Sequence, residues 1–94
     1  MSDLINISII VPFFNSEKHI KILFDALLSQ DFDGSFEIIM VNDASTDNSQ
    51  NEIVKYNIPT LKLFSLKINS GQSAARNLGL KNALGKYIFF GLSQ

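Results

Sequence analysis

Short apolar segments that alternate with helix-forming segments limit the fold of this chain more than any other feature. Four runs rich in β-branched or aromatic residues are typical of strands, at residues 7–14, 36–41, 61–66 and 86–90. The first run is almost continuously apolar, as in a strand buried on both faces. Strands separated by helices indicate a parallel sheet with right-handed crossovers. The sequence therefore predicts an α/β fold, a parallel βαβαβαβ sheet with helices on both faces.

The first helix is predicted to begin near Asn15 and Ser16, because both are residue types that favour the N-cap. Its apolar residues recur with helical spacing and form one face: Ile20, Leu23, Phe24, Leu27 and Leu28. Turn-forming residues at 31–34 separate this helix from the second strand.

The second helix is predicted to begin within the polar run 42–49 and has a weak apolar face of Ile53, Val54 and Tyr56. The third helix is predicted over residues 72–84. Gly79 makes this helix imperfect, and Gly85 is a suitable C-cap residue. The chain then ends on a strand without a covering helix, so we interpret the unit as incomplete. The alternative is that four strands and three helices suffice.

Composition excludes several classes of protein. The chain has 94 residues, of which 46% are hydrophobic, and its eight basic and nine acidic residues nearly balance. That length allows one domain or part of one. A chain without cysteine has neither a disulfide framework nor a Cys-ligated metal site. Near-neutral charge argues against nucleic acid as a partner, and no apolar run reaches the roughly 18 residues of a membrane helix. We expect a cytoplasmic location.

The candidate ligand site lies beyond the carboxyl ends of the strands, where open α/β sheets bind their ligands. Polar residues gather there in the segments 12–17, 42–47 and 69–72. Asp43 follows the second strand directly, so its carboxylate can accept a hydrogen bond from a ribose hydroxyl or a base N–H. Capping of the following helix is an equally good interpretation of Asp43. For Asp47, capping is the better interpretation.

Arg76 is the single arginine and lies about one turn into the third helix. A planar guanidinium suits a phosphate, although a solvated or salt-bridged surface arginine is the more ordinary interpretation. His19, the single histidine, is expected at the surface, since no partner for a metal site or catalytic triad lies near it. Neither a dinucleotide fingerprint nor a P-loop motif is present.

Three segments resemble the start of family 2 glycosyltransferases, which have the GT-A fold. Residues 11–17 (VPFFNSE) are similar to the family pattern V-P-x-Y-N-x-E, and residues 41–49 (VNDASTDNS) to V-D-D-G-S-x-D-x-S. Residues 69–88 match N-x-G-x-x-x-A-R-N-x-G-x-x-x-A-x-G-x-Y-I. Phe14 replaces a tyrosine, and Ala44 replaces a glycine. The resemblance covers nearly the whole chain and implies the nucleotide-binding half of a Rossmann-like fold.

The resemblance implies that this half binds the nucleotide of a sugar donor, usually a uridine diphosphate (UDP) sugar. It implies that Asp43 binds the uracil ring. Pro12 and Phe14 would line the base and ribose site, and Glu17 would lie beside the nucleotide. In family members the sugar is transferred with inversion to an acceptor hydroxyl of a saccharide or lipid-linked saccharide. Such enzymes often build bacterial surface polysaccharides, in the cytoplasm or at the membrane surface.

The diphosphate is implied to lie near Arg76, which would approach it or fix the loop around it, while Gly71 would let the backbone pass close to the ligand. The family pattern continues after the fourth strand with L-D-x-D-D, whose aspartates hold Mg²⁺ or Mn²⁺. Residues 91–94 read GLSQ instead. We therefore expect no catalytic residue and no metal ligand here. Residues 1–94 are interpreted as a truncated, incomplete nucleotide-sugar-binding part, inactive alone.

A second hypothesis places the chain in another class of protein. It is a non-catalytic α/β nucleotide-binding or interaction module that a partner chain completes. The exposed last strand motivates this hypothesis, because an unpaired strand edge can pair with another chain. It predicts self-association through that strand.

Overall fold

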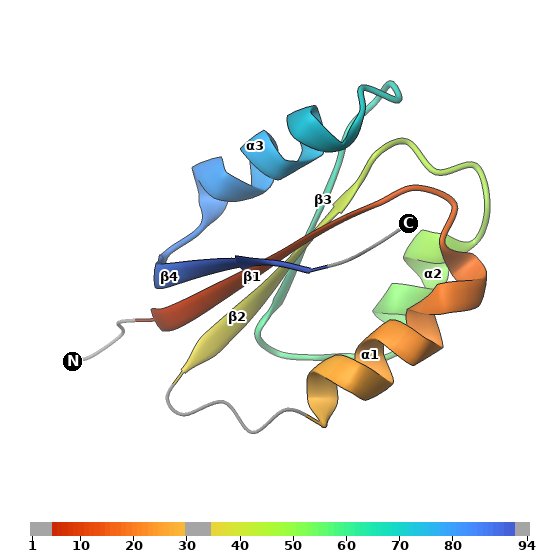
Figure 1. Ribbon diagram of the computed structural model, residues 1–94. Helices are drawn as coiled ribbons and strands as arrows, with labels where there is room; N and C mark the ends of the chain where they lie inside the picture. The colour runs from red at the N-terminus through yellow and green to blue at the C-terminus, as the bar shows by residue number, and fades with distance from the viewer. Residues whose placement is uncertain (1–4, 30–34, 92–94) are drawn as a thin grey trace.

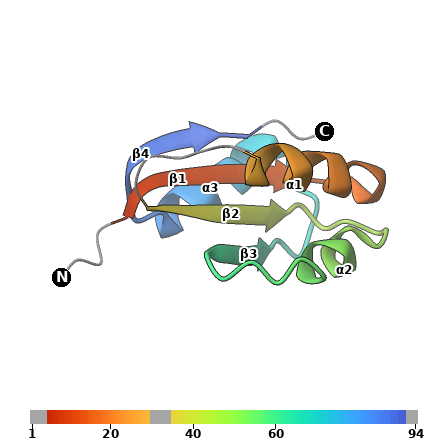
Figure 2. The same ribbon diagram turned by 90° about the horizontal axis from the view of Figure 1, so that it is seen from below.

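Four parallel strands form one sheet in the order β3-β2-β1-β4. The computed structural model describes residues 5–29 and 35–91. The strands are β1 (Ile5–Phe13), β2 (Phe36–Asn42), β3 (Leu61–Ser65) and β4 (Gly85–Phe90). Figure 2 shows them side by side, all running toward the same end of the sheet. Because β4 pairs with β1, the connection from β3 to β4 crosses the sheet and reverses the strand order.

The helices cover both faces of this sheet, as predicted. A 3₁₀ turn, η1 (Glu17–His19), leads into α1 (Ile20–Leu28), and α2 (Ser49–Val54) follows β2. Figure 1 shows α1 and α2 on one face and α3 (Gln72–Asn82) on the other. His19 is exposed, as expected. The predicted α/β class and element order are confirmed, while the turn expected at 31–34 lies outside the described residues.

Two layers of apolar side chains enclose the sheet, because successive residues of a strand point to opposite faces. The layer under α1 and α2 contains Ile9, Val11, Phe13, Ile20, Phe24, Ile38, Met40 and Ile53. The layer under α3 is smaller and contains Ile10, Ile39, Val41 and Ala75. The continuous apolar runs of β1 and β2 therefore lie buried on both faces, as the sequence predicted.

The predicted helix faces were wrong for two residues. Leu28 is 50% exposed and Val54 is 62% exposed. Leu28 lies eight residues after Ile20, which turns it about 80° away from that residue around an ideal helix. Val54 follows the buried Ile53 directly and is turned by about 100°. The tyrosine of the same predicted face does pack, since the ring centroids of Tyr56 and Phe24 lie 4.5 Å apart.

Two glycines allow close contact between elements. A Cβ on Gly79 would lie 2.5 Å from Cγ2 of Ile10, so this glycine lets α3 approach β1. The prediction that Gly85 caps the third helix was wrong, because Gly85 is the first residue of β4. A Cβ there would lie 2.5 Å from the backbone nitrogen of Ser8. The close pairing of β4 with β1, rather than helix termination, therefore requires Gly85.

A buried carboxylate near the amino ends of the strands connects all four of them. Glu37 on β2 is 2% exposed, and its Oε2 accepts hydrogen bonds from the Ser8 hydroxyl at 2.6 Å and the Leu84 amide at 2.8 Å. Lys62 on β3 forms an ion pair with Oε1 at 2.8 Å. The Ser8 hydroxyl in turn accepts the Gly85 amide at 2.7 Å. These bonds fix β4 beside β1.

The pKa of Glu37 reflects these contacts. Burial acts to raise it, but the ion pair with Lys62 and the hydrogen bonds from Ser8 and Leu84 outweigh burial and hold the pKa below its ordinary value. A carboxyl group whose pKa is lower in the folded than in the unfolded state stabilises the fold above the unfolded pKa. That stabilisation is lost as the pH falls through the folded pKa.

We therefore expect Glu37→Gln to lower the free energy of unfolding by about 1–3 kcal/mol at neutral pH, because one amide oxygen cannot replace a charged acceptor of three donors. The variant should also lose less stability than wild type as the pH falls below about 4.5, the ordinary pKa of the group. Urea unfolding at a series of pH values measures both effects. Glu52→Gln is the control, since Glu52 pairs with Lys55 at the surface of α2. Equal acid sensitivity of wild type and Glu37→Gln would contradict the prediction.

Candidate functional site

The loops after β1 and β2 are bound to each other at the carboxyl edge of the sheet. The side-chain oxygen of Asn15 accepts the amides of Thr46 at 2.8 Å and Asp47 at 3.3 Å. The Ser16 amide donates to the Ser49 hydroxyl at 2.8 Å. The first helical turn begins where the sequence predicted, with Ser16 at the N-cap position of η1, although no side-chain hydrogen bond caps it. Asn15 and Ser16 instead hold the two loops together.

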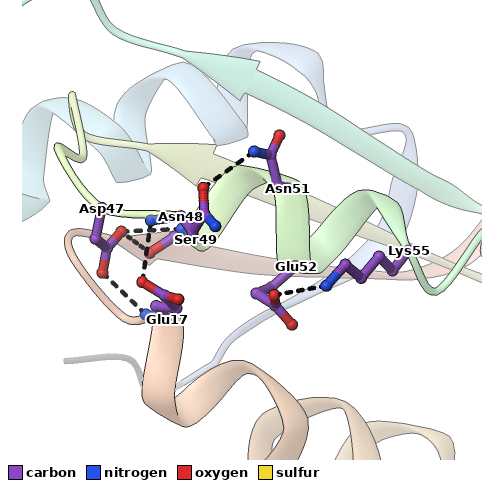
Figure 3. Close-up of polar contacts among 7 residues, drawn as sticks. All are labelled: Glu17, Asp47, Asn48, Ser49, Asn51, Glu52 and Lys55. Atoms are coloured by element: carbon purple, nitrogen blue, oxygen red, sulfur yellow. Dashed lines mark hydrogen bonds and ion pairs between the residues drawn. The ribbon is translucent and has the colours of Figure 1, made fainter.

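Carboxylates join the start of η1 to the start of α2, as Figure 3 shows. Asp47 accepts the Glu17 amide at 3.2 Å and the Ser49 amide at 2.9 Å, and it also accepts the Ser49 hydroxyl. Glu17 accepts the Asn48 amide at 3.1 Å. Asp47 thus accepts the first amide of α2, as the capping interpretation expects, from the position before the N-cap residue Asn48. Burial acts to raise the pKa of Asp47, but the bonds from Ser49 and Glu17 outweigh it and lower that pKa.

Asp43 is buried at the carboxyl end of β2 and fixes the turn that precedes α3. One carboxylate oxygen accepts the Ser70 amide at 2.7 Å, and the other accepts the Gly71 amide at 2.9 Å. The Asn69 side chain donates to the Asp43 carbonyl at 3.1 Å, and the Asp43 amide donates to the Phe13 carbonyl at 2.8 Å. The interpretation of Asp43 as a cap of the following helix, α2, was wrong, since it anchors α3.

Two residues near this turn have backbone conformations in the left-handed region. Gly71 has φ +94°, which L side chains rarely adopt, so a glycine is required by the turn itself. Ala44 has φ +62°, a conformation that favours glycine. The family pattern has a glycine at the position of Ala44, and the backbone keeps the conformation that such a glycine would adopt. The loop shape is therefore imposed by the contacts on either side of it.

Arg76 projects from the first turns of α3 toward the end of β4. Its Nη2 donates to the Gln72 side chain at 3.3 Å, and its Cζ lies 5.7 Å from the centroid of the Phe90 ring. The side chain is half-buried. Among residues 5–29 and 35–91, no carboxylate forms an ion pair with it. Arg76 is therefore not salt-bridged in the described part of the chain, although its side chain stays partly exposed to solvent.

Most of the six predicted nucleotide-binding residues share the carboxyl edge of the sheet. Pro12 is buried in β1, and Phe14, just after β1, is 40% exposed. Asp43 and Gly71 are in direct contact. Glu17 differs, because its carboxylate is engaged at the start of α2. Asn69 and Ser70, which bind Asp43, were not singled out as site residues from the sequence; their place in the polar segment 69–72, at the start of the third matching segment, was the available signal.

The described residues contain neither a metal-binding cluster nor a helix suited to crossing a membrane. No three His, Cys, Asp or Glu side chains gather in residues 5–29 and 35–91 in a way that could hold a metal ion. Within those same ranges, no helix has the length and apolar character needed to cross a bilayer. The described side chains therefore do not fit the divalent ion that the family pattern implies, and no chemical step is assigned to such an ion.

A reversed strand order with polar loops at the carboxyl edge defines a Rossmann-like α/β protein, a class whose members bind their ligands at that edge. Residues 8–90 match the family described as "Glycosyl transferase family 2". The chain belongs to this family of transferases. The resemblance seen in the sequence is confirmed, and with it the GT-A type of fold.

The curated relatives are bacterial glycosyltransferases. The chain is 43% identical over 86 residues to the poly(ribitol-phosphate) beta-N-acetylglucosaminyltransferase TarS of Staphylococcus aureus, covering 88% of this chain and 15% of TarS. It is 40% identical over 87 residues to the uncharacterized glycosyltransferase YibD of Escherichia coli, covering 89% of this chain and 24% of YibD. The chain therefore spans about a quarter or less of the length of these two relatives.

Solved structures show the same fold. S. aureus TarS 1-349 in complex with UDP-GlcNAc has a TM-score of 0.88 and 39% sequence identity, covering 95% of this chain and 26% of that one. The mannosyltransferase PcManGT of Pyrobaculum calidifontis, in complex with GDP-Man and Mn²⁺, has a TM-score of 0.83 and 26% identity, covering 88% and 26%. Members of this fold thus bind nucleotide sugars of more than one base.

We expect Asp43→Asn to free the turn before α3, because an amide side chain offers one neutral oxygen where two charged ones accept the Ser70 and Gly71 amides. Hydrogen exchange at these two amides should become at least about tenfold faster, which corresponds to a loss of about 1.4 kcal/mol. Asp47→Asn is the matched control and should leave both amides as in wild type, since Asp47 binds Glu17 and Ser49. Equal effects of the two substitutions would contradict the anchoring role of Asp43.

Proposed function

We propose that this chain is the donor-nucleotide-binding part of a family 2 glycosyltransferase and that its donor is a UDP sugar. The observation that carries the proposal is the close similarity to TarS, whose structure in complex with UDP-GlcNAc superposes on 95% of this chain at a TM-score of 0.88. The proposal treats residues 1–94 as one nucleotide-sugar-binding part of a longer catalytic domain.

The arrangement at the carboxyl edge supports a nucleotide there. Each oxygen of Asp43 accepts one amide, and a carboxylate has further lone pairs with which to accept the N–H of a uracil ring. Pro12 and Phe14 supply apolar surface for the base and ribose. Glu17 is assigned to the neighbourhood of the nucleotide, from the start of η1.

The start of α3 suits the diphosphate. A helix N-terminus presents unpaired amides and a partial positive charge to an anion. Gly71 is the N-cap residue of this helix, and no heavy atom lies within 4 Å of the place where its Cβ would be, so a ligand can approach the backbone there. Arg76 adds a full positive charge one turn further on. The acceptor saccharide, the divalent ion, the catalytic base and a cytoplasmic location belong to the proposal for the whole protein and are assigned to none of the described residues.

We expect UDP to bind with a Kd of about 0.1–10 mM, a weak affinity because part of the donor site is absent from the described residues. Titration of the isotope-labelled chain, followed by amide NMR shifts, measures it. The shifts should cluster at residues 13–17, 43, 71 and 76, and GDP should bind more weakly than UDP. Asp43→Ala should weaken UDP binding at least about tenfold.

Asp25→Ala is the control for this titration, because Asp25 pairs with Lys21 at the surface of α1. An unchanged Kd for UDP in Asp43→Ala would exclude the uracil role of Asp43. A wild-type chain whose amide chemical shifts do not change on addition of UDP would overturn the proposed function of this part of the chain.

A second candidate function is self-association through β4. This strand lies at an edge of the described sheet and pairs only with β1. Tyr87 and Phe89 are in register with Ile7 and Ile9, so they lie on the face that α1 and α2 cover elsewhere, and each is 54% exposed. An unpaired edge beside exposed aromatic rings favours contact with a second copy of the chain.

If β4 mediates self-association, sedimentation velocity at increasing concentration should show a dimer, and Phe89→Lys should abolish it because a charge opposes burial of that face. Ile22→Lys is the matched control, since Ile22 is 70% exposed and lies on α1 rather than on the edge strand. A wild-type protein that stays monomeric at high concentration would rule out this candidate.

A further inference from the structure

An aromatic ring, rather than a carboxylate, contacts the guanidinium of Arg76. The Cζ atom lies 5.7 Å from the centre of the Phe90 ring, within the range of a cation–π contact. Phe90 is in register with Ile10, so its side chain lies on the α3 face of the sheet, where Arg76 also lies. The contact therefore joins the first turns of α3 to the carboxyl end of β4.

The contact with Phe90 leaves the hydrogen-bond donors of Arg76 free to bind an acceptor. Its Nε is buried and has no hydrogen-bond partner among residues 5–29 and 35–91. Its Nη2 donates one long bond to Gln72, at 3.3 Å. A buried donor without a partner is destabilising, so the Nε–H still lacks an acceptor in the described part of the chain that compensates its burial. An aromatic ring orients the guanidinium plane but takes none of its N–H donors and leaves its charge intact.

We propose that Phe90 is a positioning residue that holds the Arg76 guanidinium ready for the diphosphate of a nucleoside diphosphate. The ring attracts the guanidinium through its charge and takes none of its N–H donors, which remain for phosphate oxygens. The start of α3, anchored by Asp43, provides backbone amides to the same anion. This inference rests on the proposed function and adds to it a residue of β4 whose own side chain touches no phosphate.

Two adjacent phenylalanines of similar exposure are expected to differ in their effect on diphosphate binding. Phe90 is 47% exposed and contacts Arg76, whereas Phe89 is 54% exposed and lies on the opposite face, in register with Ile9. Phe89→Leu is therefore a control matched in residue type, strand and exposure. Phe90→Tyr keeps the ring and serves as the conservative variant.

The test measures binding of UDP and of uridine, which lacks the diphosphate, to wild type and the three variants by amide NMR titration. Phe90→Leu should weaken UDP binding about three- to tenfold and leave uridine binding unchanged, because only the diphosphate contacts Arg76. Phe90→Tyr and Phe89→Leu should bind both compounds as wild type does. The Nε–H resonance of Arg76, shifted by the ring current of Phe90, should move in Phe90→Leu and stay in Phe89→Leu.

The outcomes distinguish this inference from the proposed function. Wild type that binds UDP while Phe90→Leu binds it equally well would overturn the positioning role alone. Equal loss of UDP and uridine binding in Phe90→Leu would also overturn it, since that result indicates general damage to the site. Wild type that binds neither compound would overturn the proposed function and this inference with it. An Arg76 Nε–H resonance that has the same chemical shift in wild type and Phe90→Leu would exclude the cation–π contact between the two residues.

Discussion

Two carboxylates, Glu37 on β2 and Asp43 directly after it, hold α3 at both ends, and the rest of the structure depends on this arrangement. Glu37 lies near the start of β2 and accepts the Leu84 amide just beyond α3, while Asp43 directly follows β2 and accepts the Ser70 and Gly71 amides just before it. The two positions differ by six residues, an even number, so strand alternation places both on the face that α3 covers. The helix therefore has a fixed position along the sheet, and so do the groups it carries.

The contacts that position α3 have different roles at the two ends of the sheet. At the amino end, Glu37 also binds β1 and β3 through Ser8 and Lys62, so the contacts there stabilise the sheet and fix β4. At the carboxyl end, the contacts shape loops instead: Asp43 orders the start of α3, and Arg76 extends from it to Phe90. A rigid sheet with ordered loops at one edge is the usual way in which this kind of fold presents a nucleotide site.

The fold could be predicted from the sequence in large part, and the site only in part. Local patterns located the four strands and three α-helices of the described residues, because apolar runs, helical spacing and cap residues are local features. The resemblance placed Asp43 and Arg76 at the donor site, but it did not show that Asp43 anchors α3 or that Asn15 joins two loops. Those contacts join residues about 30 positions apart, and local patterns carry no information about such partners. Glu37 was missed for the same reason, since a single charge in an apolar run does not reveal its partners.

The sequence by itself determined that this chain forms a parallel α/β sheet and belongs to the glycosyltransferase family. Both the apolar runs of the strands and the family motifs consist of residues that lie close together in the chain. Only the tertiary structure decided the functions of its individual glycines and polar residues. Gly85 allows β4 to pair closely with β1, and Gly79 allows α3 to pack closely on β1. A Cβ on either glycine would clash with an atom of β1 that is distant in the sequence. The strand order placed β4 beside β1 and thereby brought Phe90 to Arg76, a contact that depends on the folding of the whole sheet.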